Sequence, residues 1–380
     1  MNVSVVSLFT GMNYHVRYSG DDRPYQSGID VDRTCYADLG DEGVCVDMDY
    51  LIRHTETFEE LSESDLVFVW VYEDFLDFRD ESPAVLRDRS QAKQWFNAVG
   101  SPAASSVEEV VAKVRAPVIL LSQHGNFEES FMPMLREALP DVRNLLSAPN
   151  VVGWSEVMPR HYQLVKSLLG KVVFLPWPYQ INVVVPNRVP RKAGEPPRIY
   201  VARPFGGEGY SDNGLAAHVA AEEIGRRVGG ARISYAFRVF ESPEHRKVDE
   251  EVRLVMRMSE HACLGWLPRA DVSGRLGWMV DADLFVHLGT RGCRTWVTSD
   301  AALVGTPAVV SKGLFHEVLY PRTSVPPHAV LRAAKLGAKL LRDDDFRSDV
   351  VETARERARK FVDPDGVRAI LERAIRRHAA

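Results

Sequence analysis

Residues 282–311, ADLFVHLGTRGCRTWVTSDAALVGTPAVVS, carry the clearest indication of the fold expected for this chain. Residues 283–288 form a short apolar run that is typical of a buried strand in a parallel sheet. A basic, glycine-containing loop follows at residues 289–295, and then a helix that is predicted to end at Gly305. A second apolar strand is predicted at residues 307–311. This order of strand, loop, helix and strand indicates an α/β fold with a parallel sheet.

The loop and the start of the helix favour the binding of an anion. The helix is predicted to begin near Trp296, where its unbonded N–H groups and its dipole attract negative charge. Arg291 and Arg294 suit a diphosphate. Asp300, one turn into the helix, can accept hydrogen bonds from sugar or ribose hydroxyls. The local pattern also fits an ordinary turn with solvated arginines, and it leaves that alternative open.

The same alternation of strands and helices extends to both sides of this stretch. In the first half, strands are predicted at residues 3–9, 65–71, 117–121 and 171–175, and helices at 106–114 and 129–139, the latter ended by Pro140. Residues 186–198 hold four prolines and are predicted to be an exposed linker. In the second half, further strands are predicted at residues 198–202 and 232–236, and further helices at 214–228 and 272–280. The tail, residues 346–379, is predicted to form two helices split at Asp363-Pro364.

Two doubly wound, Rossmann-like domains follow from this pattern. The first is predicted at residues 1–188, with a C-terminal helix at about 364–380 packing back onto it, and the second at residues 196–362. Ligands of such sheets bind at the carboxyl ends of the strands, here in a cleft between the domains.

Composition agrees with a soluble enzyme. The chain has 380 residues, 45% hydrophobic and 26% charged, with a formal net charge of −5. A mildly acidic chain has no global attraction to nucleic acid. The four cysteines form no C-x-x-C pair, which favours free thiols in a reducing compartment. No signal peptide or membrane span is recognised, so a cytoplasmic location is expected.

Residues 282–311 resemble the retaining GT-B enzymes of glycosyltransferase family four. That family has a Glu-Gly-Phe-Gly loop after the strand, a second Glu eight positions after the first, and a helix that ends in Gly-Thr-Pro-Val-Val. Here GTPAVV at residues 305–310 matches the end of the pattern, and Asp300 stands at the second Glu. Gly292, or Arg291 if the loop is one residue longer, falls at the first. The resemblance implies that Asp300 holds the ribose and that the sugar-facing carboxylate is missing.

Further segments occur in the family's order. IYVARPFGG at residues 199–207 resembles the strand and loop that supply a phosphate-binding arginine, matched by Arg203, and Gly206 is assigned to the same loop. The family then has Lys-Gly, where this chain has Asn213-Gly214. The resemblance therefore implies the loss of one cation, which Arg291 or Arg294 would replace.

The resemblance also assigns contacts beyond the diphosphate. Trp266 and Leu267 would touch the base, and Gly11 would lie in a glycine loop beneath the diphosphate. His124, at the end of an apolar strand, would face the acceptor, where an imidazole can hydrogen-bond a hydroxyl or move a proton. The remaining predicted donor contacts lie in the basic loop: Gly289, Thr290, Gly292 and Thr295.

These assignments predict a glycosyltransferase that uses a UDP- or GDP-sugar, with no cofactor and no metal required. Retention of anomeric configuration is implied by the resemblance alone. The acceptor is open: a glycan, a lipid, a small molecule or a modified DNA base. The oligomeric state is open as well. Three alternatives remain: a sugar-nucleotide epimerase, a phage-type DNA base glycosyltransferase, and a sugar- or partner-binding protein that has lost catalysis.

Overall fold

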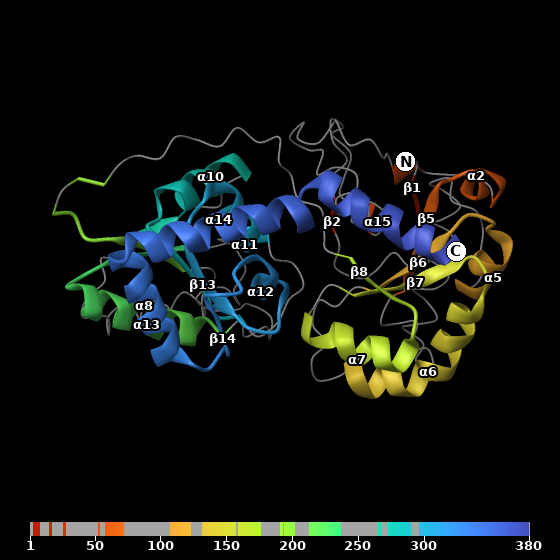
Figure 1. Ribbon diagram of the computed structural model, residues 1–380, viewed down its shortest axis with the longest axis horizontal. Coiled ribbons are helices and arrows are strands. Elements are labelled where there is room, and N and C mark those ends of the chain that lie inside the picture. The colour runs from red at the N-terminus through yellow and green to blue at the C-terminus, as the bar shows by residue number, and fades with distance from the viewer. Residues whose placement is uncertain are drawn as a thin grey trace. The chain divides into compact units, whose positions relative to one another are not determined.

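The structure of the chain is a computed structural model in which two compact units are distinguished. Unit 1 comprises Met1–Asn182 and Asp363–Ala380, and unit 2 comprises Val183–Val362. The structure describes residues 3–7, 15–16, 26–27, 52–53, 58–71, 107–122, 131–156, 159–175, 191–192, 194–201, 213–236, 265–267, 272–289 and 296–379, which are coloured in Figure 1. At some of these positions, residues 3–53 among them, only the backbone is described.

Unit 1 is built on a parallel sheet with the strand order β4-β1-β5-β6-β7-β8. Its elements are β1 (Val3–Ser7), β2 (His15–Val16), β3 (Gln26–Ser27), β4 (Ile52–Arg53), α2 (Phe58–Ser62), β5 (Leu66–Val71), α5 (Val107–Lys113), β6 (Val118–Ser122), α6 (Phe131–Ser147), β7 (Val151–Glu156), α7 (Pro159–Leu169), β8 (Val172–Phe174) and α15 (Pro364–Ala379). The strands β2 and β3 form a separate antiparallel pair. The strand order reverses beside β1, as in flavodoxin-like sheets.

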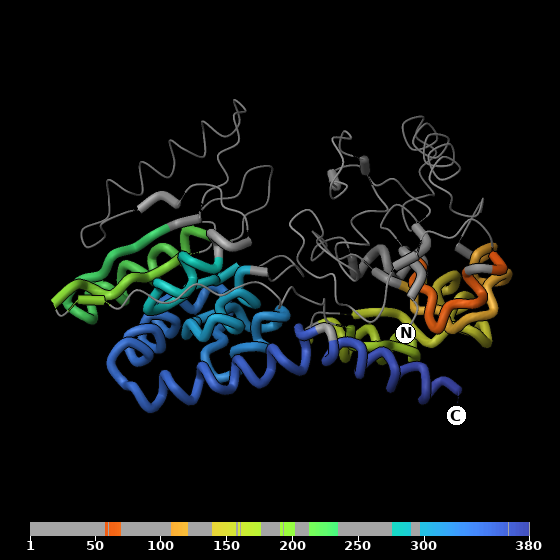
Figure 2. Tube along the Cα trace, turned by 90° about the horizontal axis from the view of Figure 1, so that it is seen from above, coloured from red at the N-terminus to blue at the C-terminus, as the bar shows by residue number. Residues whose placement is uncertain are grey.

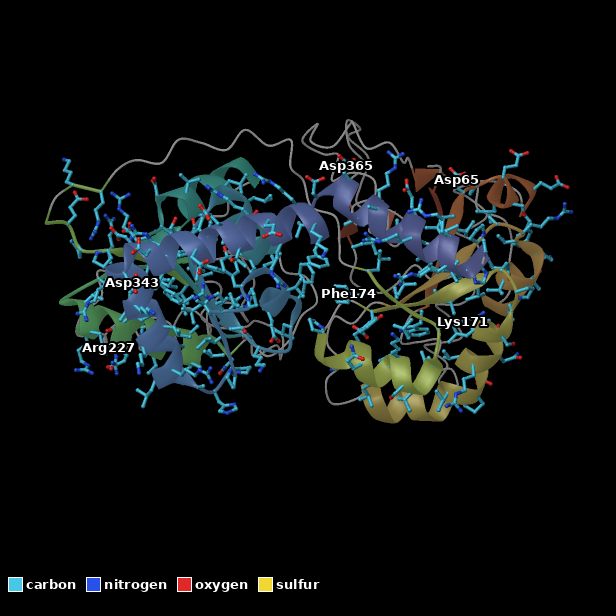
Figure 3. All side chains as sticks on the ribbon, in the orientation of Figure 1. Asp65, Lys171, Phe174, Arg227, Asp343 and Asp365 are labelled. Carbon is cyan, nitrogen blue, oxygen red and sulfur yellow. The ribbon has the colours of Figure 1, made fainter. Side chains whose placement is uncertain are left out.

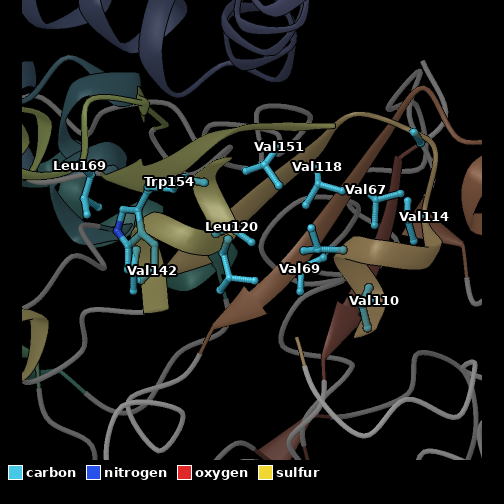
Figure 4. Close-up of a cluster of buried hydrophobic side chains, with 14 of the residues drawn as sticks. Val67, Val69, Val110, Val114, Val118, Leu120, Val142, Val151, Trp154 and Leu169 are labelled. Carbon is cyan, nitrogen blue, oxygen red and sulfur yellow. The ribbon is translucent and has the colours of Figure 1, made fainter. Parts of the chain in front are cut away.

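The core of unit 1 lies between this sheet and the helices α5, α6 and α7. Trp154 of β7 is fully enclosed, and Figure 4 shows it beside Val142 of α6 and Leu169 of α7. The side chains of Leu66, Val67, Phe68 and Val69 are all fully buried. Strand β5 is therefore covered on both faces, which is why its sequence is continuously apolar rather than alternating.

Aromatic and polar contacts stabilise the edge of the unit 1 sheet at β8. Phe174 of β8 packs edge-on against Tyr162 of α7, with ring centroids 5.6 Å apart and planes 82° apart. Lys171 Nζ donates a hydrogen bond to Val151 O at 3.2 Å. Figure 3 labels Lys171 and Phe174 at this edge.

Helix α6 corrects one expectation from the sequence. The helix was predicted to end at Pro140, but it runs through Pro140 to Ser147. A proline inside a helix removes one backbone hydrogen bond and costs about 3 kcal/mol. The apolar face continues beyond it, because Val142, Leu145 and Leu146 are buried in the core. Burial of these three side chains offsets the lost hydrogen bond, since each contributes roughly 1.5–3 kcal/mol.

Unit 2 holds a second parallel sheet, with the order β11-β10-β9-β12-β13-β14. Its elements are β9 (Arg198–Val201), α8 (Gly214–Val228), β10 (Arg232–Ala236), β11 (Gly265–Leu267), α10 (Val272–Asp281), β12 (Leu284–His287), α11 (Trp296–Val304), β13 (Ala308–Ser311), α12 (Phe315–Leu319), β14 (Ser324–Val325), α13 (Val330–Arg342) and α14 (Asp344–Phe361). Numbered along the chain, this is the 3-2-1-4-5-6 order of the Rossmann fold, and the order reverses between β9 and β12.

Helices α8 and α13 pack side by side in unit 2, and a glycine permits their close approach. A Cβ atom on Gly337 would lie 3.1 Å from Leu284 Cδ2 and closer still to Ile224 Cδ1. At the far end of the pair, Arg342 Nη2 donates a hydrogen bond to Arg227 O. Pairing 224 with 337 and 227 with 342 shows that the two helices run parallel.

The tail confirms the predicted split into two helices. Helix α14 starts after Asp343, whose Oδ1 accepts a hydrogen bond from Phe346 N at 2.9 Å. Helix α15 begins at Pro364, the position where proline is best tolerated in a helix. The tube in Figure 2 shows both helices in blue. Within unit 1, His378 Nε2 of α15 lies 2.7 Å from Pro149 O.

Candidate functional site

The candidate site lies in unit 2, where the strand order reverses. In doubly wound sheets the helices that follow two such neighbouring strands lie on opposite faces, so a ligand-binding crevice is expected at the carboxyl ends of β9 and β12, the β9–β12 crevice. Strand β9 ends at Val201, two residues before Arg203, and strand β12 ends at His287, two residues before Gly289. In the sequence, the predicted phosphate-binding arginine therefore follows one of these two neighbouring strands and the basic loop follows the other.

Two side chains from different elements hydrogen-bond the backbone of Leu288 and Gly289, the residues that lead from β12 into the basic loop and that we call the loop root. Ser311 Oγ, at the end of β13, donates to Gly289 O at 2.5 Å and approaches His287 O at 3.4 Å. Asn213 Nδ2, at the start of α8, donates to Leu288 O at 3.0 Å and to Pro327 O at 2.8 Å. Both Leu288 and Gly289 are buried, so these bonds replace solvent for their carbonyl groups.

Helix α11 places polar side chains inside the unit. Thr298, Ser299 and Asp300, in its first half, are all buried. Burial raises the pKa of the Asp300 carboxyl well above its ordinary value of 3.8, because removal from water disfavours the charged form. Its neutral form can donate as well as accept a hydrogen bond.

Two histidine rings, the buried His316 and the half-buried His287, lie next to each other, and His316 contacts the same helix. The rings of His287 and His316 are 4.4 Å apart between centroids, and His316 Nδ1 lies 2.8 Å from Thr298 Oγ1. The opposite nitrogen, His316 Nε2, is buried and has no hydrogen-bond partner in the described structure. Burial, with a smaller contribution from the charge of His287, holds the pKa of His316 well below its ordinary value of 6.5.

The end of helix α11 agrees with the sequence. The helix stops at Val304, and Gly305 takes a left-handed φ of 80°, which glycine adopts without steric cost. Thr306 N then donates to Ala301 O at 2.8 Å, and Thr306 Oγ1 donates to Met279 O at 2.5 Å. The predicted glycine stop of the helix is confirmed.

Only part of the predicted site falls within the described residues. Asp300 and Gly289 do, and both lie in unit 2 at the positions given above. Trp266 and Leu267 form part of β11, but their side chains are not described. The other predicted site residues lie outside the described residues: Gly11, His124, Arg203, Gly206, Thr290, Arg291, Gly292, Arg294 and Thr295.

Some contributors to the site were missed from the sequence. Ser311 was seen only as the end of a strand, and His316 was not noted. Asn213 was noted only for the lysine it replaces. A signal for Asn213 does exist: Asn-Gly directly before a helix marks a position where a left-handed backbone is tolerated.

The histidine pair predicts a dependence of stability on pH. Since the pKa of His316 is lower in the folded than in the unfolded state, the unfolded chain takes up a proton first as the pH falls below 6.5. Stability should therefore be constant above pH 7 and fall below pH 6.5, by at most about 1.4 kcal/mol per pH unit for this one group. His316→Asn removes the titrating ring and should flatten the loss. We expect the difference in stability between the two proteins, from urea titrations at pH 5 to pH 8, to be constant above pH 7 and to change only on the acid side.

His218 of α8 also contributes to the decrease of stability with falling pH in that experiment. Its pKa is also lowered by burial, against an opposing effect of Glu222. The His316→Asn protein should therefore keep part of the acid sensitivity. Parallel curves for the two proteins would show that His316 is charged equally in both states.

Within the described part of the chain there is neither a cluster of metal ligands nor a helix that could span a membrane. No group of three or more His, Cys, Asp or Glu side chains there is arranged to hold a metal ion. Every helix there is too short or too polar to traverse a lipid bilayer.

Comparison with known proteins places the fold. No protein-family model matches the chain, and no curated protein matches it in sequence. Among solved structures, Anabaena HepE, determined with UDP-glucose, is similar at a TM-score of 0.51 and 14% identity, over 83% of this chain and 80% of HepE. OtsA, determined without ligand, is similar at a TM-score of 0.53 and 12% identity, over 82% of this chain and 73% of OtsA.

A third similar structure, TarM, has a TM-score of 0.50 at 11% identity and matches 83% of this chain. The chain spans only about half of its length, 55%. At these identities the likeness shows the fold and nothing finer. With two doubly wound parallel units and these structural neighbours, the chain has the fold of the GT-B glycosyltransferases.

Proposed function

We propose that this protein is a glycosyltransferase that takes a sugar from a nucleotide-sugar bound at the β9–β12 crevice of unit 2. The observation that carries the proposal is the anchored loop root at that crevice, where Gly289 leads from β12 toward Arg291 and Arg294. A basic loop followed by a helix start suits a diphosphate. The UDP-glucose bound by HepE, a protein of the same fold, supports a nucleotide-sugar as donor.

The two parts of the chain would bind different substrates. In the proposal, residues 196–362 bind the donor, whose base lies against Trp266 and Leu267. Residues 1–188, with the helix at about 364–380, bind the acceptor. His124 would orient one of the two sugars, and Gly11 would lie beneath the diphosphate.

The chemistry would rest on neutralising the leaving group. The bond between the anomeric carbon and the diphosphate oxygen breaks, an acceptor oxygen takes its place, and the acceptor proton is released. Arg203 with Arg291 or Arg294, and the amides at the start of α11, would balance the charge that develops on the diphosphate. This scheme uses no metal ion. Retention of configuration is proposed from the family resemblance.

Asp300 would hold the ribose of the donor. The raised pKa of its carboxyl fits a hydrogen bond to a neutral hydroxyl better than a contact with phosphate, which would need a cation. Since the side chain is fully buried, this role requires that the carboxyl become accessible when the donor binds.

The first test is a search for the donor. A thermal-shift screen with nucleoside diphosphates and their sugars should raise the melting temperature for one nucleotide family. Release of nucleotide without any acceptor would favour an epimerase, and a salt-sensitive shift of DNA would favour a base glycosyltransferase. Binding without any turnover would favour a protein that has lost catalysis.

Arg203→Ala then tests the role of the proposed cation. With the identified donor, it should lower transfer at least tenfold, since removing one such contact costs a few kcal/mol in the transition state. Its melting temperature should stay unchanged. Arg332→Ala, which removes an exposed arginine of α13 in the same unit, is the matched control and should retain full activity. Unchanged turnover of Arg203→Ala would remove this residue from the mechanism.

A further inference from the structure

We infer that Asn213 is a positioning residue, which fixes the start of the basic loop across the β9–β12 crevice. The inference rests on the proposed function, since it takes the loop at residues 289–295 to be the diphosphate site. Asn213 itself need not touch the ligand. It acts through the backbone of Leu288.

The first observation is the set of contacts that the carboxamide makes. Its Nδ2 donates both of its hydrogens, one to Leu288 O at 3.0 Å and one to Pro327 O at 2.8 Å. Leu288 follows β12, and Pro327 lies between β14 and α13. One side chain at the start of α8 thus joins three segments that are distant in sequence. Because α8 follows β9 in the chain, the Leu288 bond spans the place where the strand order reverses.

The second observation is the backbone of Asn213. Its φ of 52° and ψ of 36° are left-handed, and no other non-glycine residue in the described ranges has a positive φ. The residue before a helix is usually extended and caps the helix with its side chain. Here there is no side-chain cap hydrogen bond, and the carboxamide is used for the two distant carbonyls instead.

These two demands specify the residue type. The position requires a side chain that tolerates a left-handed backbone, which favours Gly, Asn and Asp. It also requires two N–H donors, which neither Gly nor Asp supplies. A lysine, which the family resemblance expects here, does not favour this backbone. In place of a charged side chain, this position therefore carries a carboxamide that hydrogen-bonds the carbonyl groups of Leu288 and Pro327. We call this pair of hydrogen bonds the Asn213 clamp.

The clamp has an electrostatic consequence for an anion at the loop. A carbonyl oxygen carries partial negative charge, and two of them stand at the loop root, on Leu288 and Gly289. Asn213 covers the first and Ser311 the second with N–H and O–H donors. A diphosphate would then meet carbonyl groups that are already hydrogen-bonded, together with the positive charges of the loop.

Two variants of Asn213 and one control test the inference. Asn213→Gly keeps the left-handed backbone and removes both donors. Asn213→Asp is nearly isosteric and places a carboxylate against two carbonyl oxygens. Tyr320→Phe is the matched control, because it removes another side-chain bond to a backbone carbonyl in unit 2, the 2.7 Å bond from Tyr320 OH to Thr306 O.

The measurements are the Kd for the nucleoside diphosphate of the donor, by titration calorimetry, and the melting temperature. We expect Asn213→Gly to weaken binding roughly tenfold, as for the loss of about one net hydrogen bond to a positioned group. Asn213→Asp should weaken it further. The melting temperature should fall by roughly 2–6 °C in Asn213→Gly and in Tyr320→Phe, and Tyr320→Phe should bind as the wild type does. A wild-type Kd for Asn213→Gly would overturn the inference while leaving the proposed function intact.

Hydrogen exchange distinguishes this failure from a failure of the proposed function. If the wild type binds no nucleoside diphosphate, the proposed function is refuted, and the ligand-binding part of this inference falls with it. The clamp is tested without any ligand by amide exchange of the peptide covering residues 284–289. Exchange should be faster in Asn213→Gly than in Tyr320→Phe. Equal exchange in the two variants would show that Asn213 positions nothing.

Discussion

Phe285→Ala is expected to lower the free energy of unfolding of unit 2 by about 3–5 kcal/mol. The side chain is fully buried in β12, the strand that leads into the candidate site. Its ring stacks on Tyr200 with centroids 5.6 Å apart, and the ring of His287 lies 6.0 Å away in an edge-on arrangement. Truncation to alanine removes these contacts and leaves a cavity beneath the loop root. Since domains are stable by only about 5–15 kcal/mol, this loss would remove a large share of the stability of unit 2.

Urea unfolding followed by circular dichroism, with amide exchange of peptides from each unit, would check this result. Phe285→Leu retains most of the apolar volume and should cost roughly 1–1.5 kcal/mol. Exchange should accelerate in peptides of unit 2 in the alanine variant. A cost below that of the leucine variant would mean that the ring is not packed as described.

Trp154→Ala is expected to cost unit 1 a similar amount, about 3–5 kcal/mol, whereas Trp154→Phe should cost much less. The indole is only 1% exposed and fills the space between β7, α6 and α7. Its Nε1 is buried without a hydrogen-bond partner in the described structure. A buried N–H without an acceptor costs about 1–3 kcal/mol, so its removal in phenylalanine offsets part of the lost packing.

The same measurements on unit 1 would check both costs, and their difference reports the packing of the aromatic ring. We expect the difference between the two variants to exceed about 2 kcal/mol, with faster exchange of unit 1 peptides in Trp154→Ala. Equal costs for alanine and phenylalanine would mean that the ring volume, which only the alanine variant gives up, contributes nothing to the stability of unit 1.

The fold could be predicted from the sequence because its strands are buried on both faces. Mainly apolar runs such as residues 66–71 and 284–288 favour a parallel sheet flanked by helices. The structure confirms two such sheets, and the resemblance to GT-B enzymes pointed to the same fold. Helix boundaries with a local chemical cause, such as Gly305 and Asp363-Pro364, were also predictable.

The error at Pro140 has a physical cause that the sequence hides. A local rule stops the helix there, but the decisive contribution comes from Val142 and Leu145, which pack into a core formed by distant strands. The preference of proline to end a helix, worth a few kcal/mol, is overridden by the burial of these apolar side chains. Whether they are buried depends on strands that are distant in the sequence.

For the candidate site, the residue types that suit a diphosphate and their place after a strand could be read from the sequence: Arg203, the basic loop and Asp300. The hydrogen bonds of Asn213 and Ser311 to Leu288 and Gly289, and the burial of Asp300 and His316, are visible only in the folded chain. The reason is that charge and spacing act over a few residues, whereas these hydrogen bonds and pKa shifts arise between groups 22 to 114 residues apart, or from burial by the whole unit.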